Sequence, residues 1–360
     1  MILALHGSEN LFMLQPIGMA VLAAALTYVG VVLVRHWALR GNIIDIPNQR
    51  SSHTQPTPRG GGLAIDVIVI LFWIGYTLLR LPSSDWPPRM IFAGGAIVIA
   101  AISWLDDLYT LSNLIRFVTH FVVAVTIMFF MRSWKDLELP VVGSLSLNGW
   151  PVFPFTILWI VGLTSAYNFM DGIDGIAGLQ AVAAGLFWAA IAWQSGRADI
   201  IVLSLLIVGA SLGFLGHNWP PARIFMGDVG STVLGFMFAV IPLLYNLGPT
   251  RVDPLVAILP MWPFVFDTTF TFFRRLRRGE NVFVSHRSHL YQRLTISGWS
   301  HRMVSLLYFE LAIIGAVLAW LWNNGLSIAL VVLPVLCIAL WIFVNCREKK
   351  VSTADLDRSI

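Results

Sequence analysis

Long runs of apolar residues, separated by short polar stretches, make up most of the chain. Each run holds roughly 20 residues with few charges, which is the length that an α-helix needs to cross the hydrocarbon core of a bilayer. We predict eleven spans, at residues 11–34, 63–79, 90–105, 114–131, 152–169, 176–194, 200–216, 231–247, 254–272, 303–322 and 326–345. The pattern therefore predicts an all-α polytopic membrane protein, folded as a single multi-span domain over residues 1–360.

The composition agrees with a membrane protein. Of the 360 residues, 57% are hydrophobic and only 12% are charged, and the mean hydropathy is +0.77. Soluble domains carry about 25% charged residues, so this chain has too few charges to cover a water-facing surface. A soluble enzyme, a disordered chain and a disulfide scaffold are therefore excluded. The two cysteines, Cys337 and Cys346, both lie near the end of the chain and form no disulfide framework.

The positive residues indicate how the spans are oriented. Of the 23 Lys and Arg residues, 17 fall in the loops on one side of the predicted spans and 6 in the loops on the other. Because cytoplasmic loops carry the excess of positive charge, we expect a periplasmic amino terminus and a cytoplasmic carboxyl terminus. This asymmetry accounts for the net charge of +4 without a nucleic-acid partner. No basic residue precedes Arg35, so a cleaved signal peptide is not expected.

Two segments predict structure other than a straight span. The longest outer loop, 132–151, alternates around Gly143, which predicts a small β-hairpin, with an irregular loop as the alternative. Pro260 and Pro263 fall within the ninth span and predict a bend, because proline disrupts helical hydrogen bonding. The bend either opens a groove for a lipid between spans or has only a packing role.

Acidic residues gather at the predicted cytoplasmic ends of the spans. They stand in the segments WLDDLY, NFMDGIDG and FMGDVGS, and they are Asp106, Asp107, Asp171, Asp174 and Asp228. Carboxylates near the hydrocarbon are costly, which makes them functional candidates. Their mutual repulsion favours a cation among them, and hard oxygen ligands favour Mg²⁺, with Mn²⁺ as the alternative. Helix capping by individual Asp residues is the competing explanation.

Basic and polar residues lie in the loops on the same side. The segment 286–293, HRSHLYQR, interleaves Arg287 and His289 with Tyr and Gln, and these are donors suited to a diphosphate. The arginine run at 274–278 favours topology anchoring and contact with anionic bilayer lipid. The first cytoplasmic loop, PNQRSSHTQPTPRGGG at 47–62, is either a phosphate-facing loop or a plain connector. Acidic clusters beside basic loops favour an enzyme that acts on a nucleotide diphosphate at the membrane surface.

These motifs resemble those of the polyprenyl-phosphate N-acetylhexosamine-1-phosphate transferases, the MraY–WecA-like superfamily of the glycosyltransferase 4 family. The matching segments occur in the family's order and on the expected side of the membrane, over about residues 40–310. They are PNQRSSHTQPTPRGGG, DDL, NFMDGIDG, FMGDVGS and HRSHLYQR. The resemblance is greatest to the WecA-like and WbpL-like branch that initiates O-antigen chains. Tyr291 and Gln292 depart from the His-x-His-His cluster that WecA-like loops often carry, so sugar specificity does not transfer from WecA.

The resemblance implies the reaction and its setting. Undecaprenyl phosphate would attack the β-phosphorus of a UDP-N-acetylhexosamine, and the products would be undecaprenyl-diphospho-sugar and UMP. The enzyme would be a multi-pass protein of the bacterial inner membrane, with bilayer lipid around it and its active site facing the cytoplasm. The resemblance implies Mg²⁺ as the cofactor, and it leaves a homodimer open.

The resemblance also implies roles for individual residues. Asp228 matches the metal-binding aspartate, and Asp171 is the second candidate metal ligand. Asp106 and Asp107 would lie beside them, to bind metal indirectly or to hold the lipid phosphate. The residues expected to bind the UDP-sugar are Asn168, Asp171, Asp174, Arg287, His289, His53 and Arg59.

Three other functions stay open at this stage. The peptidoglycan translocase of the same family is disfavoured because its triple-His run is absent. A transporter of lipid-linked or nucleotide sugars would need charges along its path, and of the acidic residues only Asp66, Asp267 and Glu310 fall inside predicted spans. A scaffold subunit of a polysaccharide assembly complex would have no need of five Asp residues in three loops.

Overall fold

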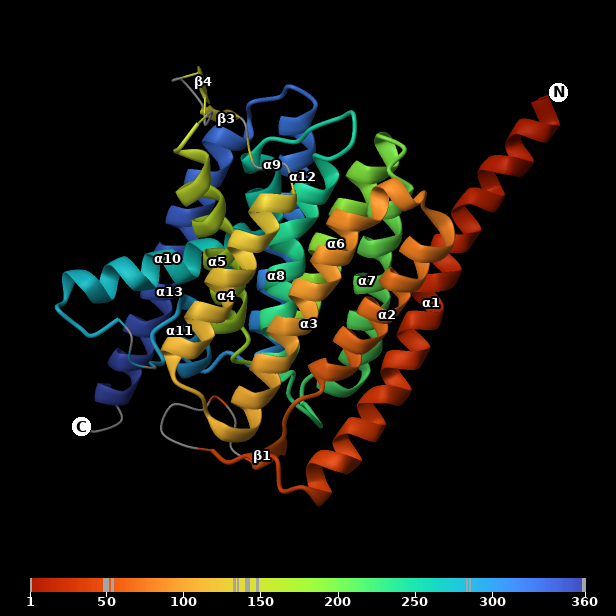
Figure 1. Ribbon diagram of the computed structural model, residues 1–360. Helices are drawn as coiled ribbons and strands as arrows, with labels where there is room; N and C mark the ends of the chain where they lie inside the picture. Colours follow the sequence, from red (N-terminus) through yellow and green to blue (C-terminus); the bar gives the residue numbers. More distant parts are fainter. Residues whose placement is uncertain are drawn as a thin grey trace.

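The computed structural model describes residues 2–47, 52, 55–131, 134, 136–139, 143–146, 149–282, 284 and 286–357. The long helices are α1 (Ile2–Arg40), α2 (Gly62–Arg80), α3 (Trp86–Tyr109), α4 (Asn113–Phe130), α5 (Val152–Met170), α6 (Ile176–Gln194), α7 (Ala198–Asn218), α8 (Gly227–Tyr245), α10 (Trp262–Arg277), α12 (His301–Asn323) and α13 (Ala329–Asp357). The shorter elements are η1 (Ser83–Asp85), α9 (Pro254–Ile258), η2 (Leu259–Met261), α11 (Leu290–Ile296), β1 (Ile44–Asp45), β2 (Thr57–Pro58), β3 (Asp136–Leu139) and β4 (Gly143–Ser146). Figure 1 shows them as one helical bundle.

Within these residues, eleven segments are long and apolar enough to cross a membrane, which confirms the predicted all-α polytopic fold. The third span begins at Ser83, seven residues before the predicted start at 90, because η1 and the first turn of α3 extend it. Prolines in a first helical turn are compatible with a helix, since the N–H groups there have no partner within the helix. The two termini lie at opposite ends of the bundle (Figure 1), as an odd number of spans requires.

Helix α8 forms the centre of the bundle. Every residue from Val229 to Tyr245 is buried, and α8 packs against α2, α3 and α5. A helix that is apolar on all sides belongs either in a protein core or in lipid, and the helices around α8 place it in the core. Gly62 lets the start of α2 approach α8 closely, because a Cβ on Gly62 would lie 2.3 Å from the Gly230 Cα atom. The start of α8 is therefore packed directly against the start of α2.

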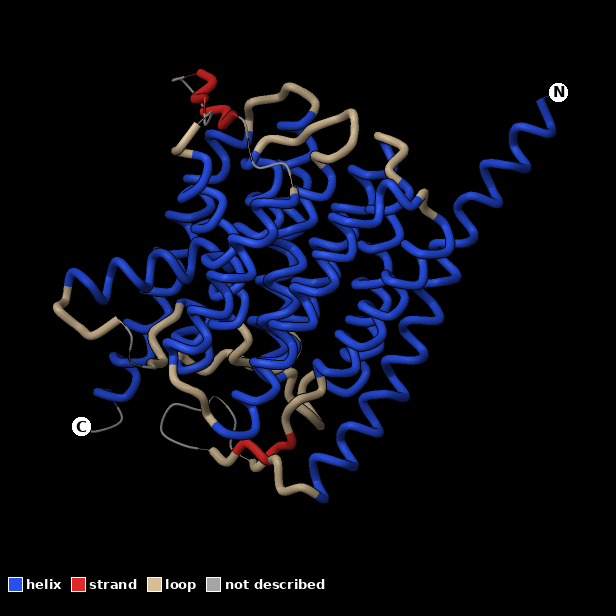
Figure 2. Tube along the Cα trace, in the orientation of Figure 1, coloured by secondary structure: helices blue, strands red, loops and turns tan. Residues whose placement is uncertain are grey.

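Two short strand pairs lie at opposite ends of the bundle (Figure 2). β3 and β4 pair in antiparallel register with Leu139 opposite Gly143, which confirms the hairpin predicted for the 132–151 loop. β1 and β2, which the sequence did not predict, pair at the other end, with Ile44 opposite Pro58. The backbone N–H of Phe225 donates to the Pro58 carbonyl oxygen at 2.9 Å and thereby joins this strand pair to the segment before α8. We call the end that carries β1 and β2 the pocket end.

The ninth span is broken as its prolines predicted. α9 ends at Ile258, the 3₁₀ turn η2 contains Pro260, and α10 begins at Trp262. In Figure 1, α10 runs sideways out of the bundle, across the direction of its neighbours. The bend therefore turns the second half of this span towards the periphery of the bundle.

A buried ionic group joins helices at the end opposite the pocket. The Asp199 carboxylate of α7 accepts from Arg89 of α3 at 2.5 Å and from both Nε and Nη2 of Arg197 at 3.0 Å. Arg197 also donates to the carbonyl oxygens of Leu244 and Tyr245 at the end of α8. One carboxylate thus connects α3 and α7 directly and reaches α8 through Arg197.

Candidate active site

A pocket of about 350 Å³ lies at the pocket end and gathers many of the predicted site residues. Those that line it are Arg59, Asp107, Asn168, Asp171, Asp174 and Asp228. Gln292, which the sequence singled out only as a departure from the family's His cluster, also lines it, and residues that the sequence did not single out complete the wall, among them Asp45, Ser52, Asn218 and His301. Asp106, Arg287 and His289 are not among the lining residues, and His53 lies outside the described residues.

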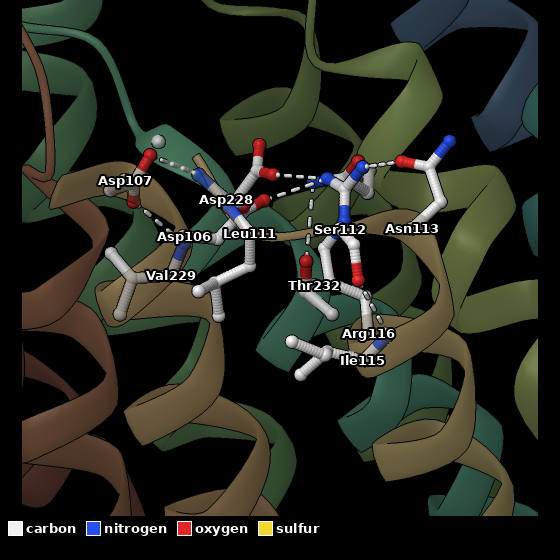
Figure 3. A network of polar contacts seen from close by, with 12 residues as sticks. Asp106, Asp107, Leu111, Ser112, Asn113, Ile115, Arg116, Asp228, Val229 and Thr232 are labelled. Atoms are coloured by element: carbon white, nitrogen blue, oxygen red, sulfur yellow. Dashed lines mark hydrogen bonds and ion pairs between the residues drawn. The ribbon is translucent and has the colours of Figure 1, made fainter. Parts of the chain in front are cut away.

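Asp107, near the end of α3, caps the first turn of α8. Its carboxylate accepts from the backbone N–H of Asp228 at 3.1 Å and from that of Val229 at 3.0 Å (Figure 3). The Arg59 Nε atom lies 3.9 Å from the same carboxylate, and Arg59 also donates to the Asp107 carbonyl oxygen. The first N–H groups of a helix have no partner within it, so a carboxylate there satisfies them and fixes the helix start. Capping is therefore part of the role of Asp107, and it sets the position of Asp228.

Arg116 of α4 joins the other two carboxylates of this region. Its Nη1 atom lies 2.7 Å from Asp106 Oδ2 and 3.0 Å from Asp228 Oδ2 (Figure 3). The backbone N–H of Leu111 donates to the second oxygen of Asp106 at 2.5 Å. Sequence reasoning counted Arg116 only as one of the positive residues that orient the spans. Its position ten residues after Asp106, in the first turn of the next span, was the available signal.

Asn168 and Asp174 organise the polar loops around the pocket. The Asn168 amide donates to the hydroxyls of Ser231 at 3.0 Å and Thr232 at 3.1 Å, which ties the end of α5 to α8. Asp174 accepts from the backbone N–H of Ala222 at 3.0 Å and lies 3.3 Å from His301 Nδ1. The other nitrogen of His301 lies 3.1 Å from the Ser52 carbonyl oxygen. His301 therefore connects the first loop to the NFMDGIDG loop.

The surroundings of Asp171 disfavour its charged form. Burial raises its pKa to about 8, and repulsion from Asp228, Asp107 and Asp174 adds to that effect. A shift of this direction shows that the folded protein disfavours the charged form. A cation beside these carboxylates would remove the repulsion.

The segment HRSHLYQR is divided between two environments. His289 is buried, and its Nδ1 atom lies 3.2 Å from Asp267 Oδ1 of α10. Asp267 also accepts from the backbone N–H groups of Leu290 at 2.8 Å and Tyr291 at 3.0 Å, so it caps α11. Gln292 instead lines the pocket. The contact of His289 and Arg287 with a diphosphate remains a prediction from the resemblance.

Tyr291 fills the space next to the NFMDGIDG loop. It is fully buried, and its hydroxyl donates to the Phe169 carbonyl oxygen at 3.2 Å. A Cβ on Gly172 would lie 2.0 Å from the Tyr291 hydroxyl oxygen, so only glycine fits at this position. The close approach places α11 directly against the loop that carries Asp171 and Asp174.

The pocket suits a hard divalent cation. Among the described residues, no three His, Cys, Asp or Glu side chains form a complete metal-binding group. Mg²⁺ usually binds one or two carboxylates and takes its other oxygen ligands from water and substrate phosphates. Asp171 and Asp228 line the same pocket and would supply two carboxylates, whereas both oxygens of Asp107 already accept from α8. The donor set therefore fits Mg²⁺ bound together with a phosphate ligand.

The fold and the pocket define a multi-span helical membrane protein with an acidic site at one end of its bundle. The model of the family described as "Glycosyl transferase family 4" matches residues 89–246. The chain is 33% identical over 292 residues to a probable undecaprenyl-phosphate N-acetylglucosaminyl 1-phosphate transferase of Bacillus subtilis, covering 80% of this chain and 79% of that protein. The chain belongs to glycosyl transferase family 4, as its motifs predicted.

Two further relatives have related functions. A decaprenyl-phosphate N-acetylglucosaminephosphotransferase of Mycolicibacterium smegmatis is 32% identical over 322 residues, which cover 80% of this chain and 77% of that protein. A phospho-N-acetylmuramoyl-pentapeptide-transferase of Lacticaseibacillus paracasei is 29% identical over 278 residues, which cover 72% of this chain and 82% of that protein. The matches thus extend over most of each relative.

Proposed function

We propose that this protein transfers an N-acetylhexosamine 1-phosphate group from a UDP-sugar to undecaprenyl phosphate and releases UMP. An oxygen of the lipid phosphate forms a bond to the β-phosphorus of the UDP-sugar, and the phosphoanhydride bond to UMP breaks. The proposal places the pocket end at the cytoplasmic face of a bacterial inner membrane, where the lipid phosphate and the water-soluble nucleotide meet.

The observation that carries the proposal is the convergence of acidic and basic groups on one pocket at the end of the bundle. Asp107, Asp171 and Asp228 come from three separate segments, and Arg59 lies among them. Phosphoryl transfer depends mainly on positioning and on neutralising charge, and this arrangement provides both. The names of two relatives, which specify polyprenyl phosphates and N-acetylglucosamine phosphate, support this class of substrates.

The proposed roles combine the resemblance with the contacts in the pocket. Asp228, which matches the metal-binding aspartate of the family, and Asp171 would hold Mg²⁺, and the ion when bound would neutralise charge on the diphosphate. Arg116 is paired with Asp106 and Asp228, and its guanidinium is suited to orient a phosphate beside Asp228. Asp107 keeps the start of α8, and with it Asp228, in place. No general base is required, because a phosphate with a second pKa of about 6 is mostly a dianion at neutral pH.

The proposal is tested by turnover of the purified protein in detergent. The assay contains undecaprenyl phosphate, Mg²⁺ and a panel of UDP-N-acetylhexosamines, and it follows UMP and lipid-linked sugar together. We expect equal amounts of both products from at least one sugar, and no product after chelation by EDTA. Asp228→Asn should abolish turnover while the protein stays folded, and Asp85→Asn, at the opposite end of the third span, is the matched control. A UDP-sugar that binds without releasing UMP would instead favour transport.

The same panel decides the place of the reaction in cell-envelope synthesis. We propose UDP-N-acetylglucosamine as the first sugar to test, because two relatives are named for N-acetylglucosamine. Initiation of an O-antigen or a related lipopolysaccharide chain follows from the resemblance of the first loop, and it predicts no turnover of UDP-MurNAc-pentapeptide. Turnover of that substrate would assign the protein to peptidoglycan synthesis, as in the Lacticaseibacillus relative.

A further inference from the structure

Helix α11 brings one residue to the pocket and its neighbour to the last span. All residues from Leu290 to Leu294 are buried, although the helix has only seven residues. Gln292 lines the pocket, and the next residue, Arg293, extends towards α13. Successive side chains on a helix point about 100° apart, so the two residues face different partners from one short helix, and a contact that fixes Arg293 also constrains how Gln292 faces the pocket. The position of Gln292 therefore depends in part on what holds Arg293.

Arg293 is held by two side chains of α13. Its Nε atom donates to Glu348 Oε1 at 2.5 Å, its Nη2 atom donates to Asn345 Oδ1 at 2.6 Å, and Nη2 also bonds the second Glu348 oxygen. Asn345 and Glu348 are three residues apart and thus share a helix face. The Arg293 side chain is 11% exposed. A guanidinium bonded by both oxygens of one carboxylate has a fixed orientation as well as a fixed position.

A second contact joins the same parts of the chain. Trp299, just after α11, packs edge-on against Phe343 of α13 with ring centroids 5.3 Å apart. The Arg347 guanidinium lies over the Trp299 ring, 5.5 Å from its centroid. Four residues in six consecutive positions of α13 therefore contact α11 or the turn that follows it.

The rest of α13 lies at the edge of the core, where Val332, Leu333, Leu336 and Cys337 are only partly buried. Of its described side chains from Val331 to Lys349, only Leu340 and Val344 are buried. The concentration of polar contacts in one stretch indicates a more specific role for this end of the helix.

We propose that the eleventh span positions the substrate pocket: Glu348 and Asn345 of α13 hold Arg293, and through α11 they keep Gln292 at the pocket wall where the UDP-sugar binds. Glu348 and Asn345 are positioning residues, because neither touches the pocket. This inference rests on the proposed function for the identity of the ligand. The connection from α13 through α11 to the pocket does not depend on the proposed function.

The test compares variants of the full-length protein in detergent. Glu348→Ala removes both carboxylate bonds, Glu348→Gln keeps one acceptor, and the exchange Arg293→Glu with Glu348→Arg reverses the pair. Glu310→Gln, on the exposed side of α12, is the matched control. Three quantities are measured: kcat and KM for UDP-N-acetylglucosamine, the Kd for UMP by calorimetry, and the apparent Tm.

We expect Glu348→Ala to raise KM and the Kd for UMP by about 10-fold or more, with a smaller change in kcat, since a small displacement of a binding group has effects of this size. The KM and Kd of Glu348→Gln should lie between those of Glu348→Ala and those of the parent. The exchanged pair should bring both values back towards those of the parent. The reacting carboxylates lie on α3, α8 and the NFMDGIDG loop, so kcat should change least. A purely structural contact would lower Tm and leave KM and Kd unchanged.

The outcomes separate this inference from the proposed function. Unchanged KM and Kd in Glu348→Ala would overturn the positioning role, whatever happens to Tm. If the parent binds UMP but releases none from any UDP-sugar, the transferase proposal fails, and a weaker Kd in Glu348→Ala still supports the positioning role. A parent that neither turns over nor binds UMP overturns both.

Discussion

Replacing Gly172 by Ala should displace α11 from the pocket, and replacing Tyr291 by Phe in that variant should restore it. The added Cβ would lie 2.0 Å from the Tyr291 hydroxyl oxygen, well inside van der Waals contact. The Tyr291 ring cannot move aside freely, because it is fully buried between His289 and Tyr308, with ring centroids 5.7 Å and 6.3 Å away. Overpacking of this kind costs about 1–3 kcal/mol.

The Tyr291→Phe change removes the atom responsible for the clash. Alone, it loses the hydrogen bond to the Phe169 carbonyl oxygen, worth about 0.5–1.5 kcal/mol. In the double variant the nearest ring carbon lies 3.1 Å from the new Cβ, a tight contact that a small shift relieves. The double variant should therefore be more stable than Gly172→Ala alone, with a coupling energy of about 1–2 kcal/mol between the two changes.

The assay is the apparent Tm of the four proteins of this cycle in one detergent, with UMP release measured in parallel. The expected order of Tm is parent, Tyr291→Phe, double variant and then Gly172→Ala. UMP release should follow the same order, because α11 carries Gln292 into the pocket. A double variant that melts below Gly172→Ala would refute the steric argument, since it would mean that the hydroxyl stabilises the crowded state.

Four further outcomes are expected. Asp199→Asn should lower the free energy of unfolding by about 3–5 kcal/mol, because it leaves Arg89 and Arg197 buried without their shared carboxylate. An unchanged apparent Tm would contradict this loss of stability. Arg116→Met should lower kcat about 100-fold, since one positioned hydrogen-bond donor is lost, and Arg116→Lys should recover part of the activity. A kcat equal to that of the parent in Arg116→Met would show that Arg116 has no role in the reaction. Below about pH 8, Mg²⁺ affinity should rise with pH by up to about tenfold per pH unit. The reason is that Asp171, whose pKa is raised to about 8, must lose its proton to bind the ion. Calorimetry that shows the same affinity at every pH would exclude Asp171 as a ligand. The same raised pKa means that the folded metal-free protein holds this proton more tightly than the unfolded chain does. Its stability should therefore fall as the pH rises from about 4 to about 8, and thermal unfolding at several pH values tests this.

The spans could be predicted because the bilayer imposes one length and one polarity on every crossing helix. Their ends were less predictable, since a helix can continue past the hydrocarbon, as α1 does to Arg40. The β1–β2 pair gave no sequence signal, because two residues per strand are too few to show alternation. The bend in the ninth span was predictable from Pro260 and Pro263, but the sideways direction of α10 depends on tertiary packing.

In the candidate site, the residue types could be predicted from the sequence, but their contacts could not. Asp107, Asp171 and Asp228 could be selected because carboxylates near hydrocarbon are costly, but the sequence could not show that Asp107 caps α8. Capping and function are not alternatives here, since the cap on α8 is what positions Asp228. Arg116 could not be distinguished from the charges that orient the spans, because its pairing with Asp106 and Asp228 exists only in three dimensions.

The segment HRSHLYQR shows why a motif match does not identify the contacting atom. The orientation of α11 is set from outside, by Asp267 at its start and by Glu348 beside Arg293, so its register with respect to the pocket could not be derived from the motif. As a result the residue that matches the family, His289, is buried against α10, whereas Gln292, which departs from the family pattern, lines the pocket. Differences in sugar selectivity between this protein and its relatives should therefore be sought at Gln292 before His289.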